Sequence, residues 1–559
     1  MNISFKPTKS THILLIILAV VIVYANSLDA KFVWDDTSLI VENPYIKSWH
    51  NLDSIFAKNI YHGANKIWNY YRPLQVLSYM AEYSIWGLNT FGYHLVSLML
   101  HAINAVLVYL LILAIFGSSG IALLTALMFA TAPVISSVTY YVSARADLLV
   151  AMFMLLSALT FFEYHRKRKA QFYIASILSF VFALLSRENA IILPFLLIMI
   201  FFQNKERDRK TLLRSISPYF LILFVYIFLR ATVLNFSVAP DKFAPGNYIT
   251  QTSLLYRLLT DFKVLITYLR LLLFPFNLHM NWYIRPASSI LEPGLVFCMG
   301  LMTLLAIIIK KASRDHPQIL FGVAWFFVTL LPVLNIYPLS TFLHDAWLYV
   351  PCIGFFFILS TILLKIAPRR VGRGIIAIFL LYFTITTVVH GRVWRDNVSL
   401  FKNTVKHNSD NPYIYSVHIN LALAYFHDDR YEEAMRECHY AISLEPEAAG
   451  AYNNLGIFYA DKGDYVNAIK NFKICIKLNK ELPMPHLNLA VTYNTLGYFN
   501  KAVSAITRCI ELNPDYYRPY YVLGAIYSNM GEFDKAKIEF AKALTLNNED
   551  PDNKIFSRR

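Results

Sequence analysis

The sequence has little charge and almost no cysteine. Charged residues make up only 16% of its 559 residues, and its five cysteines include no Cys-x-x-Cys pair. This cysteine usage argues against a zinc ribbon, a thioredoxin-type site and a disulfide-rich secreted module. Hydrophobic residues instead make up 57% of the chain, and the mean hydropathy is +0.44. The balance excludes a disordered protein, a fibrous protein and a purely soluble enzyme, and it leaves room for a large membrane unit and one further domain.

Apolar stretches long enough to cross a bilayer recur through the first 390 residues. Lys and Arg concentrate in alternate loops between them, which indicates the cytoplasmic side and places the N-terminus in the cytoplasm. One more apolar segment, 256–276, contains several charged residues and would break this alternation if it crossed, so we interpret it as an interfacial or re-entrant helix on the outer face. The C-terminus is then expected outside. The eleven predicted spans are 12–28, 92–116, 120–140, 147–164, 171–186, 189–203, 216–235, 292–310, 317–338, 346–365 and 373–390.

The net charge of +15 raises the question of a nucleic-acid partner. The five predicted inner segments together hold 18 basic and 3 acidic residues, which accounts for the whole excess. Membrane topology therefore explains the charge, and we expect no nucleic-acid partner.

From residue 415 the sequence changes to a soluble pattern with a 34-residue period. A small residue follows a leucine in each unit, at Ala422, Gly456, Ala490 and Gly524. This period and spacing are typical of tetratricopeptide repeats, in which each unit is a pair of packed helices. Small residues allow the two helices of a pair to approach. The sequence therefore predicts a four-repeat solenoid, a class of fold that usually binds peptide or protein on its concave face.

Asparagines recur one position before the leucine in three of the units, at Asn420, Asn454 and Asn488. They lie on the first helix of each unit, where an amide could clamp the backbone of a bound peptide. The alternative interpretation is that they are solvated polar positions.

Two adjacent carboxylates, Asp35 and Asp36, come soon after the first predicted span. Such a pair could supply a general base and its orienting neighbour, or it could cap a short helix. Further ionisable groups lie at the outer ends of other spans, within 140–147, 186–189 and 344–349. Interfacial anchoring explains any single group of this kind, but several groups on one face favour a shared site.

Five short motifs and a C-terminal repeat array, in this order, resemble the transmembrane-and-tetratricopeptide-repeat (TMTC-type) O-mannosyltransferases of the GT-C glycosyltransferase superfamily. The motifs are Phe32-Val33-Trp34-Asp35-Asp36, Tyr71-Arg72-Pro73-Leu74, Ser143-Ala144-Arg145-Ala146-Asp147, Ser186-Arg187-Glu188 and Leu348-Tyr349-Val350-Pro351.

The resemblance implies an all-α fold, with a polytopic GT-C-type helical membrane domain of about eleven spans followed by a tetratricopeptide-repeat solenoid. The expected segments, in chain order, are a membrane domain at 1–395 with its outer loop at 29–91, a linker at 396–414, four repeats at 415–550 and a tail at 551–559.

The resemblance also implies a chemistry. The donor would be a polyprenyl-phosphate sugar, typically mannose, and the acceptor a Ser or Thr hydroxyl of an exported protein that reaches the repeats. The anomeric centre would invert, with Asp35 as the general base and Asp36 orienting it or contacting the acceptor.

The lipid phosphate leaves as an anion and needs cationic partners. Arg72 and Arg145 are the candidates by this analogy. Asp147 and Glu188 would hold these arginines or bind sugar hydroxyls.

The sequence departs from the family pattern before the Leu-Tyr-containing motif. Family members usually carry Glu-Arg there, whereas this chain has Asp345 and Ala346. Asp345 keeps the acidic group for the donor site, but the arginine is lost. If that arginine normally meets the lipid phosphate, His344, Arg285 or Arg270 must replace it, or the donor differs.

The sequence leaves alternative functions open. The chain could be a GT-C transferase acting on a lipid or a cell-wall glycan, or a non-catalytic membrane-anchored repeat scaffold. We expect no cofactor, although Asp35, Asp36 and Glu188 could together hold a divalent cation. The short array favours a bacterial inner membrane with periplasmic repeats over an endoplasmic reticulum membrane with luminal repeats.

Overall fold

A computed structural model describes residues 8–60, 70–203, 208–232, 234 and 248–547 of the chain. Within these ranges it contains helices, turns and loops but no strand, which confirms the all-α class. The residues group into two compact units. The first unit comprises 1–36, 69–78 and 86–396, and the second comprises 37–68, 79–85 and 397–559. The predicted tail at 551–559, residues 61–69 of the predicted outer loop, and residues 1–7 and 204–207 in the predicted inner segments lie outside the described residues.

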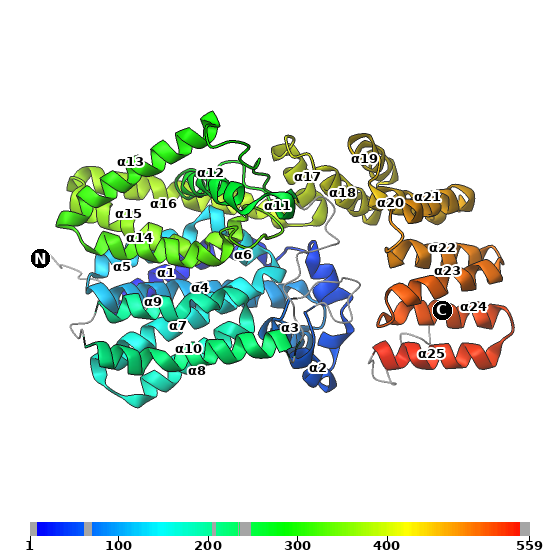
Figure 1. Cartoon of the computed structure of the whole chain (residues 1–559), viewed down its shortest axis with the longest axis horizontal. Coiled ribbons are helices and arrows are strands. Elements are labelled where there is room, and N and C mark those ends of the chain that lie inside the picture. The colour runs from blue at the N-terminus through cyan, green and yellow to red at the C-terminus, as the bar shows by residue number, and fades with distance from the viewer. Residues whose placement is uncertain (1–7, 61–69, 204–207, 233, 235–247, 548–559) are drawn as a thin grey trace, which may run out of the picture. The chain divides into compact units, whose positions relative to one another are not determined.

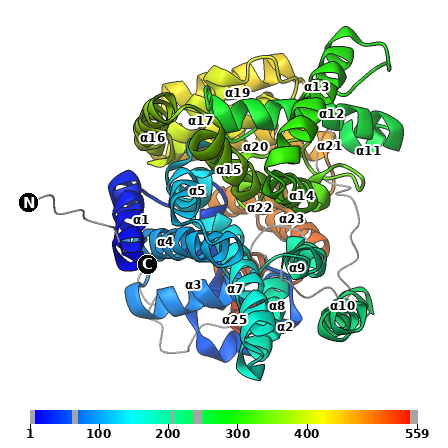
Figure 2. The same ribbon diagram turned by 90° about the vertical axis from the view of Figure 1, so that its left-hand side faces the viewer.

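The first unit is a bundle of apolar helices. Helices α4, α7 and α8 run nearly side by side in Figure 1, and α10 is seen close to end-on in Figure 2. An apolar segment in lipid can satisfy its backbone groups only internally, so these stretches become helices. The helices are α1 (Lys9–Tyr24), α4 (Thr90–Phe116), α5 (Ser119–Thr131), α6 (Ser137–Tyr140), α7 (Arg145–Lys167), α8 (Ala170–Ser186), α9 (Leu193–Phe201), α10 (Arg209–Thr232), α11 (Tyr248–Gln251), α12 (Leu254–Leu273), α13 (Pro293–Asp315), α14 (Gln318–Leu330), α15 (Pro351–Thr361) and α16 (Arg369–Gly391). Helix α3 (Pro73–Trp86) is divided between the two units.

The predicted spans fall on these helices, and several helices can cross a membrane. Six described helices are long and apolar enough to do so, or seven if the bent pair at 119–131 and 133–140 counts as one span. Four shorter apolar helices, at 170–186, 188–201, 318–333 and 351–366, coincide with the remaining predicted spans. The chain is therefore a membrane protein, and the total of eleven crossings stays a prediction.

The predicted interfacial segment is helix α12. Its buried residues, which include Asp261, Leu265, Tyr268 and Leu272, recur at three- and four-residue spacing along one face. This is the pattern of an amphipathic helix.

The second unit contains the repeats, and Figure 1 shows its helices stacked pair after pair. Outside the repeats it also holds α2 (Leu52–Ala57) from the outer loop and α17 (Asn397–His407), so the predicted linker at 396–414 contains a helix. The four repeat pairs are α18 (Tyr415–His427) with α19 (Tyr431–Leu444), α20 (Ala449–Asp461) with α21 (Tyr465–Leu478), α22 (Pro483–Thr495) with α23 (Phe499–Leu512), and α24 (Tyr517–Asn529) with α25 (Phe533–Asn547).

The small residues of the repeat allow close helix approach. A Cβ atom on Gly456 would lie 2.5 Å from the ring of Phe472, and one on Gly524 would lie 2.8 Å from the ring of Phe540. Ala422 and Ala490, the equivalent residues of the other repeats, are fully buried. In the second and fourth repeats a large ring therefore faces the small residue across the helix pair, as the sequence pattern requires.

Candidate active site

The Asp35–Asp36 pair lies in a tight turn of the first unit. The N–H of Asp36 donates to the carbonyl of Val33 at 3.0 Å, and the N–H of Val33 donates to Oδ2 of Asp36 at 3.0 Å. The turn over 33–36 is therefore closed in both directions. Trp34 within it has φ +50°, a left-handed conformation that bulky residues rarely adopt. Asp36 is fully buried, whereas Asp35 is partly exposed.

Asp36 joins the first motif to the third, 107 residues further along the chain. Its Oδ1 accepts hydrogen bonds from the Ser143 N–H at 2.8 Å and from the Ser143 hydroxyl. The Ser143 carbonyl in turn accepts from Nε2 of Gln75 at 2.8 Å, which brings in the helix that follows Arg72. Both oxygens of Asp36 are thus used in holding the turn, and neither caps the next helix. Burial raises the pKa of Asp36 from an ordinary 3.8 to about 7.

A cluster of arginines and carboxylates lies at the ends of helices α3, α7, α8 and α10. Glu188 stands between two arginines, with Oε2 3.4 Å from Arg72 and Oε1 3.5 Å from Arg230. The neighbouring Arg187 forms an ion pair with Asp147. All five side chains are between 11% and 24% exposed, so the cluster is largely withdrawn from solvent but still reachable. Three guanidinium groups and two carboxylates leave one net positive charge, which suits an anionic ligand.

Arg145 has a different environment. It is fully buried, and its guanidinium donates to the Tyr93 carbonyl at 2.8 Å and to the Ser97 hydroxyl at 3.1 Å. These bonds connect the start of α7 to the first two turns of α4. Arg145 therefore braces the helices that carry the site, and its donors point into protein.

Asp345 is also buried, at 1% exposure. Its Oδ1 accepts from the Ala346 N–H at 2.8 Å and lies 3.1 Å from Nδ1 of His344. Of the three residues considered as replacements for the lost arginine, His344 is thus the one that contacts Asp345. Arg270 lies over the Trp282 ring instead, at 6.0 Å.

Tyr349 ties the last motif to the others. Its hydroxyl lies 2.7 Å from Nδ1 of His101 and accepts from Nδ2 of Asn104 at 3.2 Å. Asn104 also donates to the carbonyl of Leu148 at 3.0 Å, one residue after Asp147. The motif is therefore bound to α4 and α7 through buried polar groups.

Sequence reasoning assigned no role to Ser143, Arg187 or Arg230. A signal for Arg230 was present, because it lies inside the predicted span 216–235, where an ionisable residue is a functional candidate by default. No sequence signal pairs Ser143 with Asp36 across 107 residues.

The divalent-cation alternative gains nothing from this geometry. Among the residues that the structure describes, no three His, Cys, Asp or Glu side chains gather as metal ligands do. Asp36 accepts from Val33 and Ser143, and Glu188 faces two arginines. These carboxylates are engaged with protein donors and cations.

Two of the three recurring asparagines join successive repeats. Nδ2 of Asn454 donates to the Ile419 carbonyl at 3.1 Å, and Nδ2 of Asn488 donates to Oδ1 of Asn453 at 3.1 Å. Asn454 is buried, and Asn420 is partly exposed.

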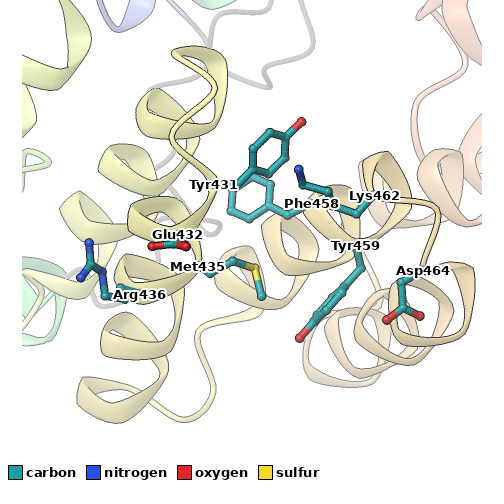
Figure 3. Close-up of a pocket in the computed structure, with 8 residues that line it drawn as sticks. All are labelled: Tyr431, Glu432, Met435, Arg436, Phe458, Tyr459, Lys462 and Asp464. Carbon is teal, nitrogen blue, oxygen red and sulfur yellow. The ribbon is translucent and has the colours of Figure 1, made fainter.

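A pocket of about 550 Å³ opens between the first and second repeats. Figure 3 shows its lining, in which rings and a thioether lie among charged groups of both signs. The lining residues are Tyr431, Glu432, Met435, Arg436, Phe458, Tyr459, Lys462 and Asp464.

Two families match parts of the chain. Residues 76–235 match the family described as dolichyl-phosphate-mannose-protein mannosyltransferase. Residues 449–482, 486–516 and 517–550 match the tetratricopeptide repeat. The first match includes Arg145, Asp147, Glu188 and Arg230 but not the Asp35–Asp36 turn.

Similar curated proteins include protein O-mannosyl-transferase F38B6.6 of Caenorhabditis elegans, which is 25% identical over 78% of this chain and 63% of its own length. Human protein O-mannosyl-transferase TMTC1 is 23% identical over 77% of this chain and 54% of its own length. The chain thus spans between half and two thirds of the length of these two curated relatives. A solved structure titled "Crystal structure of MamA" matches 27% of this chain and 86% of its own at 24% identity, with a TM-score of 0.24, too low to establish a shared fold. The resemblance to the TMTC-type O-mannosyltransferases is confirmed by the two family matches and by these relatives.

Proposed function

We propose that this protein is a membrane glycosyltransferase that moves a sugar, mannose by its relatives, from a polyprenyl phosphate to Ser or Thr hydroxyls of exported proteins. The observation that carries the proposal is the pairing of a locked aspartate turn with a cluster of three arginines in the same unit. The mannosyltransferase-family match covers most of that cluster.

The two aspartates take different roles because their surroundings differ. Asp35 is partly exposed and can meet a substrate, whereas Asp36 is buried and bonded to Ser143. Asp35 is the general base: it takes the proton of the acceptor hydroxyl as that oxygen forms a bond to C1 of the sugar. The bond from C1 to the phosphate oxygen breaks with its electron pair, so the anomeric centre inverts. Asp36 holds the turn that aims Asp35.

The arginine cluster stabilises the leaving phosphate. A sugar phosphodiester carries one negative charge, and the departing lipid phosphate gains a second. Fixed positive charge near this phosphate is supplied by Arg72, Arg187 and Arg230. Such preorganised charge is a major source of catalysis. Asp147 and Glu188 hold the guanidinium groups in place. Arg145 acts indirectly, because it fixes the start of α7, which carries Asp147.

The repeats bring the acceptor. Their pocket between the first two repeats combines apolar rings with charged groups, which suits a side chain of an extended peptide. The partly exposed Asn420 remains a candidate for a peptide contact, whereas the Asn454 and Asn488 amides serve the joints between repeats. With the predicted topology, site and repeats lie in the bacterial periplasm, or in the lumen of the endoplasmic reticulum as the alternative.

The test is sugar transfer by the purified full-length protein in detergent. Labelled polyprenyl-phosphate mannose is supplied with a pool of exported proteins, and label is followed into protein, lipid and glycan fractions. Label on protein supports the proposal, and label on lipid or glycan replaces its acceptor. Absence of transfer from mannose and other polyprenyl-phosphate sugars would overturn it in favour of a membrane-anchored scaffold.

Replacing Arg72 by Ala should lower kcat about 100-fold, because removing one preorganised charge from a developing oxyanion typically has this effect. Arg72→Lys should recover part of the loss, since it keeps the charge without the planar fork. The matched control is Arg166→Ala, at an exposed arginine on the predicted cytoplasmic side. Equal losses in the Arg72 and Arg166 variants, measured as initial rates at saturating donor, would contradict a phosphate-binding role.

The transfer rate should fall as pH drops below about 7, because Asp36 has a pKa raised to about 7 by burial. The ionised carboxylate accepts from Val33 and twice from Ser143. Protonation of Asp36 would convert one of its carboxylate oxygens from an acceptor into a hydroxyl donor, which would then face an N–H or O–H donor. On the acidic side of the pH–rate profile, the rate should approach a tenfold loss per pH unit. Asp36→Asn should remove this acidic decline and lower the maximal rate. An identical acidic decline in the wild type and in the Asp36→Asn variant would assign the titration to another group.

A further inference from the structure

Trp34 is held in an unfavourable backbone conformation. Its φ of +50° lies in the left-handed region, where the Cβ atom of a non-glycine residue crowds the backbone. Such strain persists only where surrounding contacts determine it. The contacts of the Trp34 side chain should therefore explain why a tryptophan occupies this position.

The ring of Trp34 begins a stack of three aromatic side chains, Trp34, Tyr141 and Trp394. Trp34 stacks on Tyr141 with ring centroids 5.6 Å apart and an interplanar angle of 19°. Tyr141 stacks on Trp394 at 5.6 Å and 28°. Tyr141 and Trp394 are buried, at 9% and 2% exposure. Stacked aromatic pairs attract one another beyond the effect of the area that they bury, so the stack opposes the backbone strain at Trp34.

The stack and the hydrogen bonds hold the same turn from two sides. Tyr141, which carries the Trp34 ring, is two residues before Ser143, which binds Asp36. On the other side, the N–H of Lys31 donates to the carbonyl of Arg395 at 2.9 Å, next to Trp394. The backbone between these anchors carries Asp35. The direction of the Asp35 carboxylate is therefore set by where the aromatic stack places the turn.

We infer that Trp34 is the positioning residue for Asp35: stacked on Tyr141 and Trp394, it fixes the turn over 33–36 so that the Asp35 carboxylate faces the acceptor hydroxyl. This inference rests on the proposed function. Trp34 acts through the base and not on the substrate, so it should affect the rate of the chemical step more than substrate binding. A displacement of about 1 Å in a catalytic group can lower a rate 100-fold.

The first measurement does not need activity. Hydrogen exchange of the backbone over 31–37 is followed in the full-length protein in detergent. In the wild type the Asp36 N–H should be protected by its bond to the Val33 carbonyl. Trp34→Ala should lose this protection and Trp34→Phe should keep it. Trp34→Gly separates the effect of losing the ring from the effect of backbone strain, since glycine adopts positive φ without strain but has no ring. Protection retained in the Gly and Ala variants would overturn the inference.

The second measurement is the kcat and donor KM of the same variants. Trp34→Ala and Trp34→Gly should lower kcat about 10- to 100-fold with donor KM changed less than about twofold, and Trp34→Phe should recover most of the rate. Trp394→Leu, at the far end of the stack, should give a loss in the same direction and add little to Trp34→Ala. An unchanged kcat in a variant that has lost protection would overturn the inference. A wild type that shows protection but transfers no sugar would overturn the proposed function, and the catalytic role of Trp34 with it.

Discussion

Asp35→Asn should lower the rate of sugar transfer about 1,000-fold or more, because an amide of the same shape cannot take up the acceptor proton, and positioned bases contribute about 100- to 10,000-fold. The partly exposed Asp35 shares its turn with Asp36, whose hydrogen bonds do not involve the Asp35 side chain. The substitution should therefore leave the turn folded. Initial rates with labelled donor and acceptor provide the measurement, and thermal unfolding in detergent checks that the protein is intact.

Two further asparagine substitutions make this result specific. Asp29→Asn changes an exposed carboxylate of the same outer segment and should leave the rate within about twofold. Asp36→Asn should reduce the rate less than Asp35→Asn, because it loosens the turn without removing the base. If Asp36→Asn were the inactive variant and Asp35→Asn retained full turnover, the roles of the two aspartates would have to be exchanged.

The parts of the fold that depend on local sequence were predictable. The repeats follow from a period in which Gly456 and Gly524 must be small to admit the rings of Phe472 and Phe540. The membrane helices follow from the length of their apolar runs. The helix α17 inside the expected linker was not foreseen, although its apolar residues Val398, Phe401 and Val405 recur at helical spacing; at eleven residues, the signal is short.

The site was predictable as a set of motifs but not as a set of contacts. Arg145 and Arg187 both occur in motifs at the outer ends of predicted spans, and nothing in the sequence separates them. Only the fold shows that Arg145 is buried against Tyr93 and Ser97, whereas Arg187 pairs with Asp147 in a reachable cluster. A contact between residues far apart in sequence depends on how the helices pack, and a motif does not encode that packing.

Packing can be tested most sharply where two helices touch through glycine. Gly354 of α15 faces Gly322 of α14, and a Cβ atom on Gly354 would lie 2.4 Å from the Gly322 carbonyl oxygen and 2.9 Å from the Phe326 N. Both obstacles are backbone atoms, so no side-chain rotation can relieve the clash. Small residues allow such close approach between membrane helices. Helix α15 begins two residues after Tyr349, so its displacement would also disturb the bonds to His101 and Asn104.

Gly354→Leu should therefore destabilise the protein by about 3 kcal/mol or more, at the upper end of what overpacking produces. Gly300→Leu is the matched control, because it makes the same change in apolar helix α13, where a Cβ atom would have no neighbour within 4 Å. Thermal unfolding of the two variants in the same detergent gives the comparison. The Gly354 variant should unfold well below the wild type or fail to fold, and the Gly300 variant should match the wild type. Equal stability of the Gly354→Leu and Gly300→Leu variants would mean that α14 and α15 can move apart without loss of protein stability. Tyr349 would then have to be held to α4 and α7 by its hydrogen bonds alone, with no contribution from the α14–α15 contact.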